Sequence, residues 1–141
     1  MKYALLIYSD QSDWWDLSEE EAAEQRATTI DRWYTLFDDL RRADASVSGH
    51  ELESATEAKV VRVREGERII TDGPFAETKE LIGGLFLTEL PDLDEAIRLA
   101  SLIPTAEHGS IEIRPVVERS RDEGDAADDA GGGRGAQEGA A

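Results

Sequence analysis

Residues 58–71 read AKVVRVREGERIIT, and the order of elements can be worked out from this stretch outward. Valine alternates with arginine over residues 61–64, which is the period-two pattern of a half-buried β-strand. A Glu-Gly pair then marks a tight turn, after which a second run contains two isoleucines and a threonine. The stretch therefore predicts a β-hairpin with strands at 58–64 and 68–71.

The chain after the hairpin predicts a strand, a helix and a last strand. Residues 82–90 (IGGLFLTEL) are typical of a strand whose paired glycines indicate a bulge or a close backbone approach. Asp92 and Glu95 have the spacing of a capping box, so a short helix should begin there and end before Pro104. Residues 109–117 form the last strand, and Pro115 predicts that it lies at a sheet edge. The helix is expected to bury Leu93, Ala96, Ile97, Ala100 and either Leu102 or Ile103.

The chain before the hairpin predicts a strand, a long helix and a further strand candidate. Residues 2–8 (KYALLIY) are an apolar run too short for a helix, as in a buried central strand. Ser18 and Glu21 form a capping box, and the apolar spacing that follows predicts a helix over roughly residues 18–43. Residues 46–53 form the further strand candidate. The expected buried face of the long helix consists of Ala23, Ala27, Ile30, Trp33, Tyr34, Phe37 and Leu40.

The resulting element order is β-α-β-β-β-β-α-β, and it predicts an α+β fold. This order fits a ferredoxin-like split β-α-β unit with an extra hairpin after the first helix, in which both helices pack on one face of an antiparallel sheet. The other face then needs cover, which a second subunit often supplies. We therefore expect a homodimer whose interface contains Leu85, Leu87 or the first strand.

Length and composition favour one folded domain with an acidic tail. The chain has 141 residues and a net charge of −17, which opposes binding to a phosphate backbone, so we expect no nucleic-acid partner. Residues 1–118 are expected to form the domain. Residues 119–141 contain Gly, Ala and acidic side chains but no Leu, Ile, Val or aromatic residue, which predicts a disordered tail.

The composition also predicts where the protein is located and whether it binds a cofactor. The chain has no cysteine, and the apolar run at its start is too short for a signal-peptide core or a membrane span. We therefore expect a cytoplasmic protein without membrane contact. Two histidines far apart in sequence and no glycine-rich phosphate loop after a strand predict neither a metal site nor a cofactor.

Residues 72–80, DGPFAETKE, resemble the signature of the DGPF group within the YCII-related family. The flanking segments agree with that group in layout over residues 1–117. The resemblance implies a dimeric α+β barrel, in which two ferredoxin-like subunits pack sheet against sheet, with a cleft near the signature. A few members of that family are regarded as small-molecule enzymes. Members of the DGPF group often occur beside extracytoplasmic-function sigma factors, and this context alone suggests a sigma factor as a further partner.

The candidate catalytic residues are Asp72 and a histidine. The resemblance implies that Asp72 belongs to an acid–base pair, although an Asp before Gly-Pro also commonly accepts backbone hydrogen bonds in a turn, with an unusual φ angle at Gly73. His108 is the first candidate base and His50 the second; the alternative role for His108 is that of a loop histidine bonded to the backbone. Proton transfer would require the pair to lie within ~3 Å or to share one water.

The rest of the signature is a candidate binding loop made of Gly73, Pro74, Phe75, Glu77 and Lys79. Lys79 could orient an anionic or phenolic small molecule, or could belong to a solvated turn with local salt bridges. Phe75 either anchors the loop in the core or stacks on an aromatic ligand.

Two functions remain open from the sequence. One is a cofactor-independent acid–base enzyme acting on a small molecule. The other is a non-catalytic ligand-binding or regulatory module, associated with a sigma factor. The wider family places a histidine near the first helix, where this chain has none, and this departure favours the second function.

Overall fold

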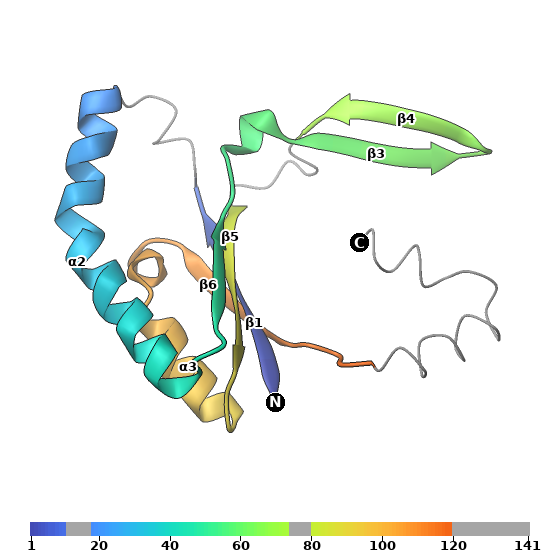
Figure 1. Ribbon diagram of the computed structural model, residues 1–141. Coiled ribbons are helices and arrows are strands. Elements are labelled where there is room, and N and C mark those ends of the chain that lie inside the picture. Colours follow the sequence, from blue (N-terminus) through green and yellow to red (C-terminus); the bar gives the residue numbers. More distant parts are fainter. Residues whose placement is uncertain (11–17, 74–79, 120–141) are drawn as a thin grey trace.

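The computed structural model describes residues 1–10, 18–73 and 80–119. It confirms the predicted order of strands and helices and adds two short 3-10 helices (Figure 1). The elements are β1 (Lys2–Ser9), α2 (Glu19–Ala43), β2 (Ser48–Glu51), η1 (Ala55–Glu57), β3 (Lys59–Arg64), β4 (Glu67–Asp72), β5 (Leu81–Glu89), α3 (Leu93–Ser101), η2 (Pro104–Glu107) and β6 (Ser110–Pro115).

The strands form two separate antiparallel sheets. Four of the described strands make one sheet in the order β2-β5-β1-β6, and β3 and β4 pair with each other in a second sheet. Both helices cover the same face of the four-stranded sheet (Figure 1). This α+β arrangement is compatible with the predicted ferredoxin-like fold and its extra hairpin.

Both predicted capping residues start their helices. The Ser18 hydroxyl accepts a hydrogen bond from the backbone N–H of Glu21 at 3.1 Å, and Asp92 accepts one from Glu95 at 2.9 Å. Each bond satisfies an N–H group that the helix itself leaves without a partner.

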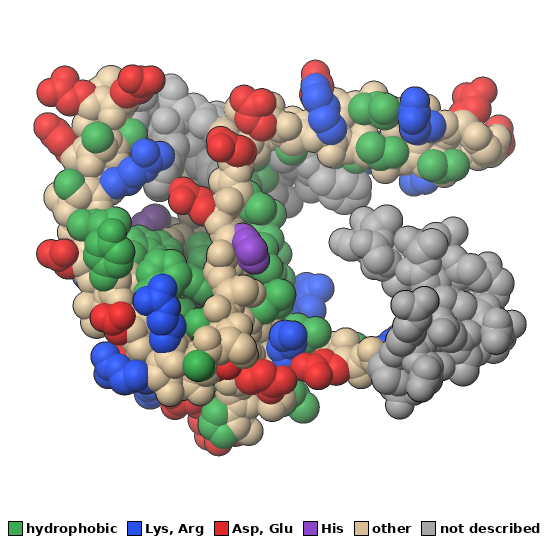
Figure 2. Space-filling model, viewed as in Figure 1, with side chains coloured by type: hydrophobic (Ala, Val, Ile, Leu, Met, Phe, Trp, Pro, Cys, Tyr) green, Lys and Arg blue, Asp and Glu red, His purple; other side chains and the backbone are tan. Residues whose placement is uncertain are grey.

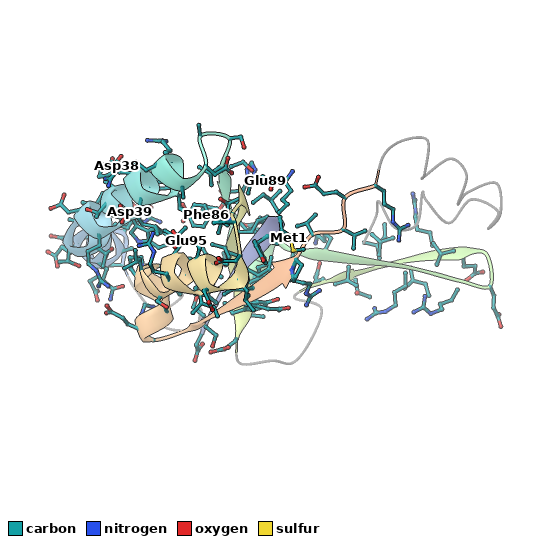
Figure 3. The ribbon with its side chains drawn as sticks, turned by 90° about the horizontal axis from the view of Figure 1, so that it is seen from below. Met1, Asp38, Asp39, Phe86, Glu89 and Glu95 are labelled. Atoms are coloured by element: carbon teal, nitrogen blue, oxygen red, sulfur yellow. The ribbon has the colours of Figure 1, made fainter. Side chains whose placement is uncertain are left out.

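The hydrophobic core lies between the four-stranded sheet and the helices. Phe86 of β5 points toward the helices (Figure 3), and its ring meets that of Phe37 edge-on at a centroid distance of 5.5 Å. Gly49 of β2 makes room for Phe86, because a Cβ at this position would lie 2.6 Å from the ring. The buried members of the core are Tyr3, Leu5, Leu36, Leu40, Phe86, Leu90, Ala96, Leu99 and Ile103.

The predicted buried face of α2 is wrong at four of its seven positions. Ala23, Ala27, Ile30 and Tyr34 are exposed, whereas Leu36, which the prediction omitted, is buried. In the first turns of α2 the reason is geometric, because the helix extends beyond the end of the four-stranded sheet and has no sheet beneath it there (Figure 1).

The predicted buried face of α3 is confirmed in part. Ala96, Ala100 and Ile103, the second of the two residues left open, are buried, whereas Leu93 and Ile97 are exposed. Leu99, which the prediction omitted, is also buried. Residues three and four apart share a helix face, so Leu99 belongs to the same face as Ala96 and Ile103.

The glycine pair in β5 has both of its predicted roles. The register between β1 and β5 shifts between Ile7 and Tyr8, so that Gly83 has no partner in β1 and forms the bulge. A Cβ on Gly84 would lie 2.8 Å from the carbonyl oxygen of His50, which is the close backbone approach. The edge position predicted from Pro115 is also confirmed, because β6 borders the sheet.

The hairpin β3–β4 forms as predicted, but it is not half-buried. Its turn residues Glu65 and Gly66 have φ angles of 52° and 78°, as in a two-residue hairpin turn. Val61 and Val63 are 59% and 62% exposed, because the hairpin projects away from the body instead of packing on it. It points to the side opposite the helices in two perpendicular views (Figures 1 and 3).

Within the described ranges, no helix is long and apolar enough to cross a membrane. The predicted disorder of the tail concerns residues that, apart from Arg119, lie outside those ranges.

Candidate functional site

Asp72 lies at the end of β4, where it faces Lys59 across the hairpin. The two residues are register partners, and the Lys59 ammonium donates a hydrogen bond to the Asp72 carboxylate. Both side chains are largely exposed, at 82% for Asp72 and 65% for Lys59. Among the described residues, the Asp72 carboxylate thus has a cation as its partner, not the backbone amides of its own turn.

This ion pair sets the protonation of Asp72. The hydrogen bond from Lys59, and then its positive charge, lower the pKa of Asp72 below the ordinary aspartate value. The same contact raises the pKa of Lys59. A carboxyl group that transfers protons near neutral pH needs a raised pKa, so this environment favours a permanently charged carboxylate.

Gly73 follows Asp72 and is required for space, not for an unusual backbone angle. Its N–H donates to the carbonyl oxygen of Ala58 at 2.8 Å, and a Cβ on Gly73 would lie 2.7 Å from the Cβ of Ala58. The predicted unusual φ angle at Gly73 is wrong, because Gly66 is the glycine with a positive φ in the described part of the chain. Gly73 thus closes the base of the hairpin.

Residues 74–79 lie outside the described ranges, so the roles expected for Pro74, Phe75, Glu77 and Lys79 stay predictions. The signature is described again at Glu80, just before β5. Its carboxylate accepts a hydrogen bond from the Ser110 hydroxyl at 3.1 Å. The last residue of the signature therefore meets the first residue of β6.

His108 lies two residues before Ser110, in the turn that joins η2 to β6. Its backbone N–H donates to the carbonyl oxygen of Thr105 at 3.2 Å, and its side chain is exposed. His108 is thus a loop residue, and the printed hydrogen bond is made by its backbone, so the role expected for its imidazole stays a prediction. The next residue, Gly109, packs so closely on β1 that a Cβ would overlap the carbonyl oxygen of Tyr8.

His50 lies in β2, on the face of the sheet that the helices leave uncovered. It is the register partner of Leu85, Leu85 is the partner of Leu6, and Leu6 is the partner of Glu112. Directly paired residues in antiparallel strands point to the same face, so these four side chains form one row across the sheet. We call the surface around this row, which includes Leu6, Leu85 and Leu87, the open face.

The three candidate catalytic residues therefore belong to three different places. Asp72 is at the base of the projecting hairpin, His108 is in the turn before β6, and His50 is on the open face. No hydrogen bond within the described residues joins Asp72 to either imidazole, and Lys59 is the partner that the carboxylate has instead.

Two interactions near these positions were not predicted. The first is the Lys59–Asp72 pair, which the sequence could have predicted. With a two-residue turn at residues 65–66, Arg64 pairs with Glu67, and each step away from the turn pairs the next two residues until Lys59 meets Asp72. The second is a network on the open face, in which Glu112 accepts hydrogen bonds from the Tyr8 hydroxyl at 3.2 Å and from Arg114 Nε at 2.8 Å. It depends on pairing between strands about 100 residues apart, which sequence spacing does not reveal.

The network changes the chemistry of Tyr8. Burial, and then the neighbouring Glu112 carboxylate, raise the pKa of the Tyr8 hydroxyl above its ordinary value. Tyr8 therefore stays protonated and acts as a hydrogen-bond donor. Across residues 1–10, 18–73 and 80–119, no three His, Asp or Glu side chains are grouped so that they could hold a metal ion.

Comparisons with known proteins identify the family of this chain. The family model of the YCII-related domain matches residues 1–120. An uncharacterized protein of Rhizobium meliloti (strain 1021) is 35% identical over 120 residues, which cover 82% of this chain and 92% of that protein. The chain belongs to the family of YCII-related domain proteins.

Proposed function

We propose that this protein is a non-catalytic small-molecule-binding module that works as a homodimer. The non-catalytic part rests on Asp72, the first candidate for proton transfer. Its carboxylate is paired with Lys59, is exposed to solvent and has a lowered pKa. These properties suit a structural ion pair better than a general acid or base.

The homodimer is supported by the open face. Its apolar side chains Leu6, Leu85 and Leu87 are only half-buried, although they lie in the two central strands of the sheet. Hydrophobic side chains also gather on the side of the sheet away from the helices (Figure 2). Contiguous apolar side chains on a sheet face are typical of an interaction surface, and a second copy packed face to face would cover them.

The chemistry of the open face indicates the class of ligand. Apolar Leu6 and Leu85 lie between His50 on one side and Glu112 on the other, in a single cross-strand row. A space enclosed by two such faces would have apolar walls with a few hydrogen-bonding groups, which is typical of small-molecule sites. The ligand would have an apolar ring or chain that bears a polar group.

NMR titration of the 15N-labelled protein with indole and with 4-hydroxybenzoate tests this proposal. We expect the amide signals of β1 and β5 near Leu6 and Leu85 to shift. Leu6→Ser should weaken the effect, whereas Ile97→Ser, a change on the outer side of α3, should leave it intact. Absence of shifts with both probes, or shifts confined to the helices, would contradict the proposal.

The acid–base enzyme is the second candidate, and one observation favours it. The hydrogen bond from Ser110 to Glu80 brings the end of the signature to the turn that holds His108. A turnover of any small molecule that is lost in both Asp72→Asn and His108→Gln, with an unchanged molecular mass, would replace the binding module by this enzyme. The sigma-factor association stays a prediction from the family resemblance.

A further inference from the structure

We infer that the hairpin β3–β4 is an arm that docks on a second copy of this chain through the face formed by Val61, Val63 and Ile70. The inference rests on the proposed homodimer and adds a second contact surface outside the open face. Four properties of the hairpin carry it: its isolation, its apolar face, its reach and its charge.

In the described residues, the hairpin lacks the partners that a two-stranded ribbon usually needs. Among the six described strands, β3 and β4 pair only with each other, while the other four form a separate sheet. An isolated pair of strands is at best marginally stable in water, and packing against another layer normally supports it. The ribbon therefore requires cover that its own chain does not provide in the described residues.

The register places the hairpin's most exposed apolar side chains on one face. Val61 pairs directly with Ile70, and Val63 lies two residues further along the same strand, so all three side chains point the same way. They are 59%, 54% and 62% exposed, respectively. On the opposite face, Val60 pairs with Thr71 and is half-buried. The exposed face is therefore the one that needs a partner.

The hairpin is long enough to reach a second copy. It projects to the same side as the open face, away from the helices (Figures 1 and 3). Six residues per strand span about 20 Å, whereas two sheets that pack face to face lie about 10 Å apart. In a face-to-face dimer, each hairpin would thus extend past the sheet of the other copy to its helix layer.

The charge of the hairpin fits the rest of the chain. Residues 59–72 contain four basic and three acidic residues and so carry +1, whereas the whole chain carries −17 and the remainder therefore −18. A second copy offers an acidic surface that also has apolar side chains: α2 begins with three glutamates, and Ile30 and Tyr34 on the same helix are 40% and 62% exposed. An apolar face edged by Arg68 matches such a surface in both charge and hydrophobicity.

Sedimentation equilibrium of a double variant provides the first test. In Val61→Thr with Val63→Thr, both strand residues stay β-branched, so the hairpin keeps its conformational preference while its apolar contact is lost. We expect the dimer dissociation constant to rise about tenfold or more. Val60→Thr on the opposite face is the matched control and should leave that constant unchanged.

Paramagnetic labelling provides a second test that leaves the apolar face intact. The chain has no cysteine, so Arg64→Cys near the hairpin tip can be labelled with a nitroxide at that site alone. When the labelled protein is mixed with unlabelled 15N-enriched protein, signals of the 15N-enriched copy should broaden. Absence of broadening, or an unchanged dissociation constant in the double variant, would show that the hairpin does not dock on the second copy. Neither result would contradict the homodimer. A monomeric wild-type protein would contradict the homodimer itself.

Discussion

Among single residues, Asp44 joins two elements outside the candidate site through the hydrogen bonds of its carboxylate. It follows α2 and accepts hydrogen bonds from the backbone N–H of Glu89 at 2.8 Å, from the buried Thr88 hydroxyl at 3.3 Å and from the N–H of Ser46 at 2.9 Å. Asp44 thereby ties the end of the first helix to β5. Because a buried group that loses its partner keeps its desolvation penalty, Asp44→Ala should reduce the free energy of unfolding by about 1–3 kcal/mol.

The stability difference at Asp44 should depend on pH. Burial acts to raise the pKa of Asp44, but the hydrogen bonds from Ser46, Glu89 and Thr88 together hold that pKa below its ordinary value. A lowered pKa in the folded state adds stability above the unfolded pKa of about 3.9, and this stability is lost as pH falls through the folded pKa. In urea unfolding, the free energy of unfolding should therefore differ between wild type and Asp44→Ala at pH 7, and this difference should become smaller below about pH 4. Asp38→Ala, at an exposed position of the same helix, is the control and should match wild type at both pH values.

The Lys59–Asp72 pair gives a prediction that bears directly on the proposed function. If the ion pair determines the protonation of Asp72, Lys59→Gln should raise the pKa of Asp72 toward the ordinary aspartate value. Carboxyl 13C NMR titration measures this pKa. Because both side chains are exposed, the stability of the protein should remain the same. An Asp72 pKa that is already raised in the wild-type protein would contradict the structural role and favour proton transfer.

At the scale of elements, Gly49 shows why β2 can pack closely on its neighbour. A Cβ here would lie 2.6 Å from the buried Phe86 ring, which cannot move aside without disturbing the contact with Phe37. Gly49→Ala should therefore reduce the free energy of unfolding by about 1–3 kcal/mol. In a Phe86→Leu background the same change should cost less, since the smaller side chain leaves space. Equal effects in both backgrounds of this double-mutant cycle would show that the clash is not the cause.

The sequence predicted which elements form better than it predicted what covers them. Capping residues, the hairpin turn and the glycine bulge are local signals, and the structure confirms all three. Burial depends on which element lies opposite. For this reason Ile30 and Tyr34 have a helical apolar spacing yet are exposed, and Val61 and Val63 alternate as in a half-buried strand yet project into solvent.

The candidate site could be predicted less well than the elements, because it also depends on tertiary packing. Its residues came from a motif and from two histidines, but their distances depend on how the hairpin departs from the sheet. The Lys59 partner could have been found by counting from the turn, whereas the Tyr8–Glu112 contact joins the first and last strands and follows from tertiary pairing alone.

At the scale of the whole molecule, exposed apolar surface and acidic charge together characterise this chain. Acidic side chains are spread over α2 and the ends of the sheet, while basic ones are prominent on the hairpin (Figure 2). The apolar open face and the hairpin both lie on the side of the sheet that the helices do not cover (Figure 1). A second copy would cover both surfaces at once.

A charge on the open face should separate the two copies without unfolding either. Leu85 is half-buried at the centre of the open face, so Leu85→Arg leaves a solvated side chain in a monomer but a buried charge in a dimer. We expect the dimer dissociation constant to rise by about a hundredfold or more in sedimentation velocity experiments. Ile97→Arg on the outer side of α3 is the control and should leave the constant unchanged.

The most direct test of the account is the mass of the unmodified protein in solution. Sedimentation equilibrium at micromolar concentration measures this mass independently of shape. We expect twice the 15.5 kDa of a single chain, because two copies pack with their open faces in contact. A mass of 15.5 kDa at that concentration would contradict it, because the open face and the hairpin would then remain exposed and no enclosed site for a small molecule would form.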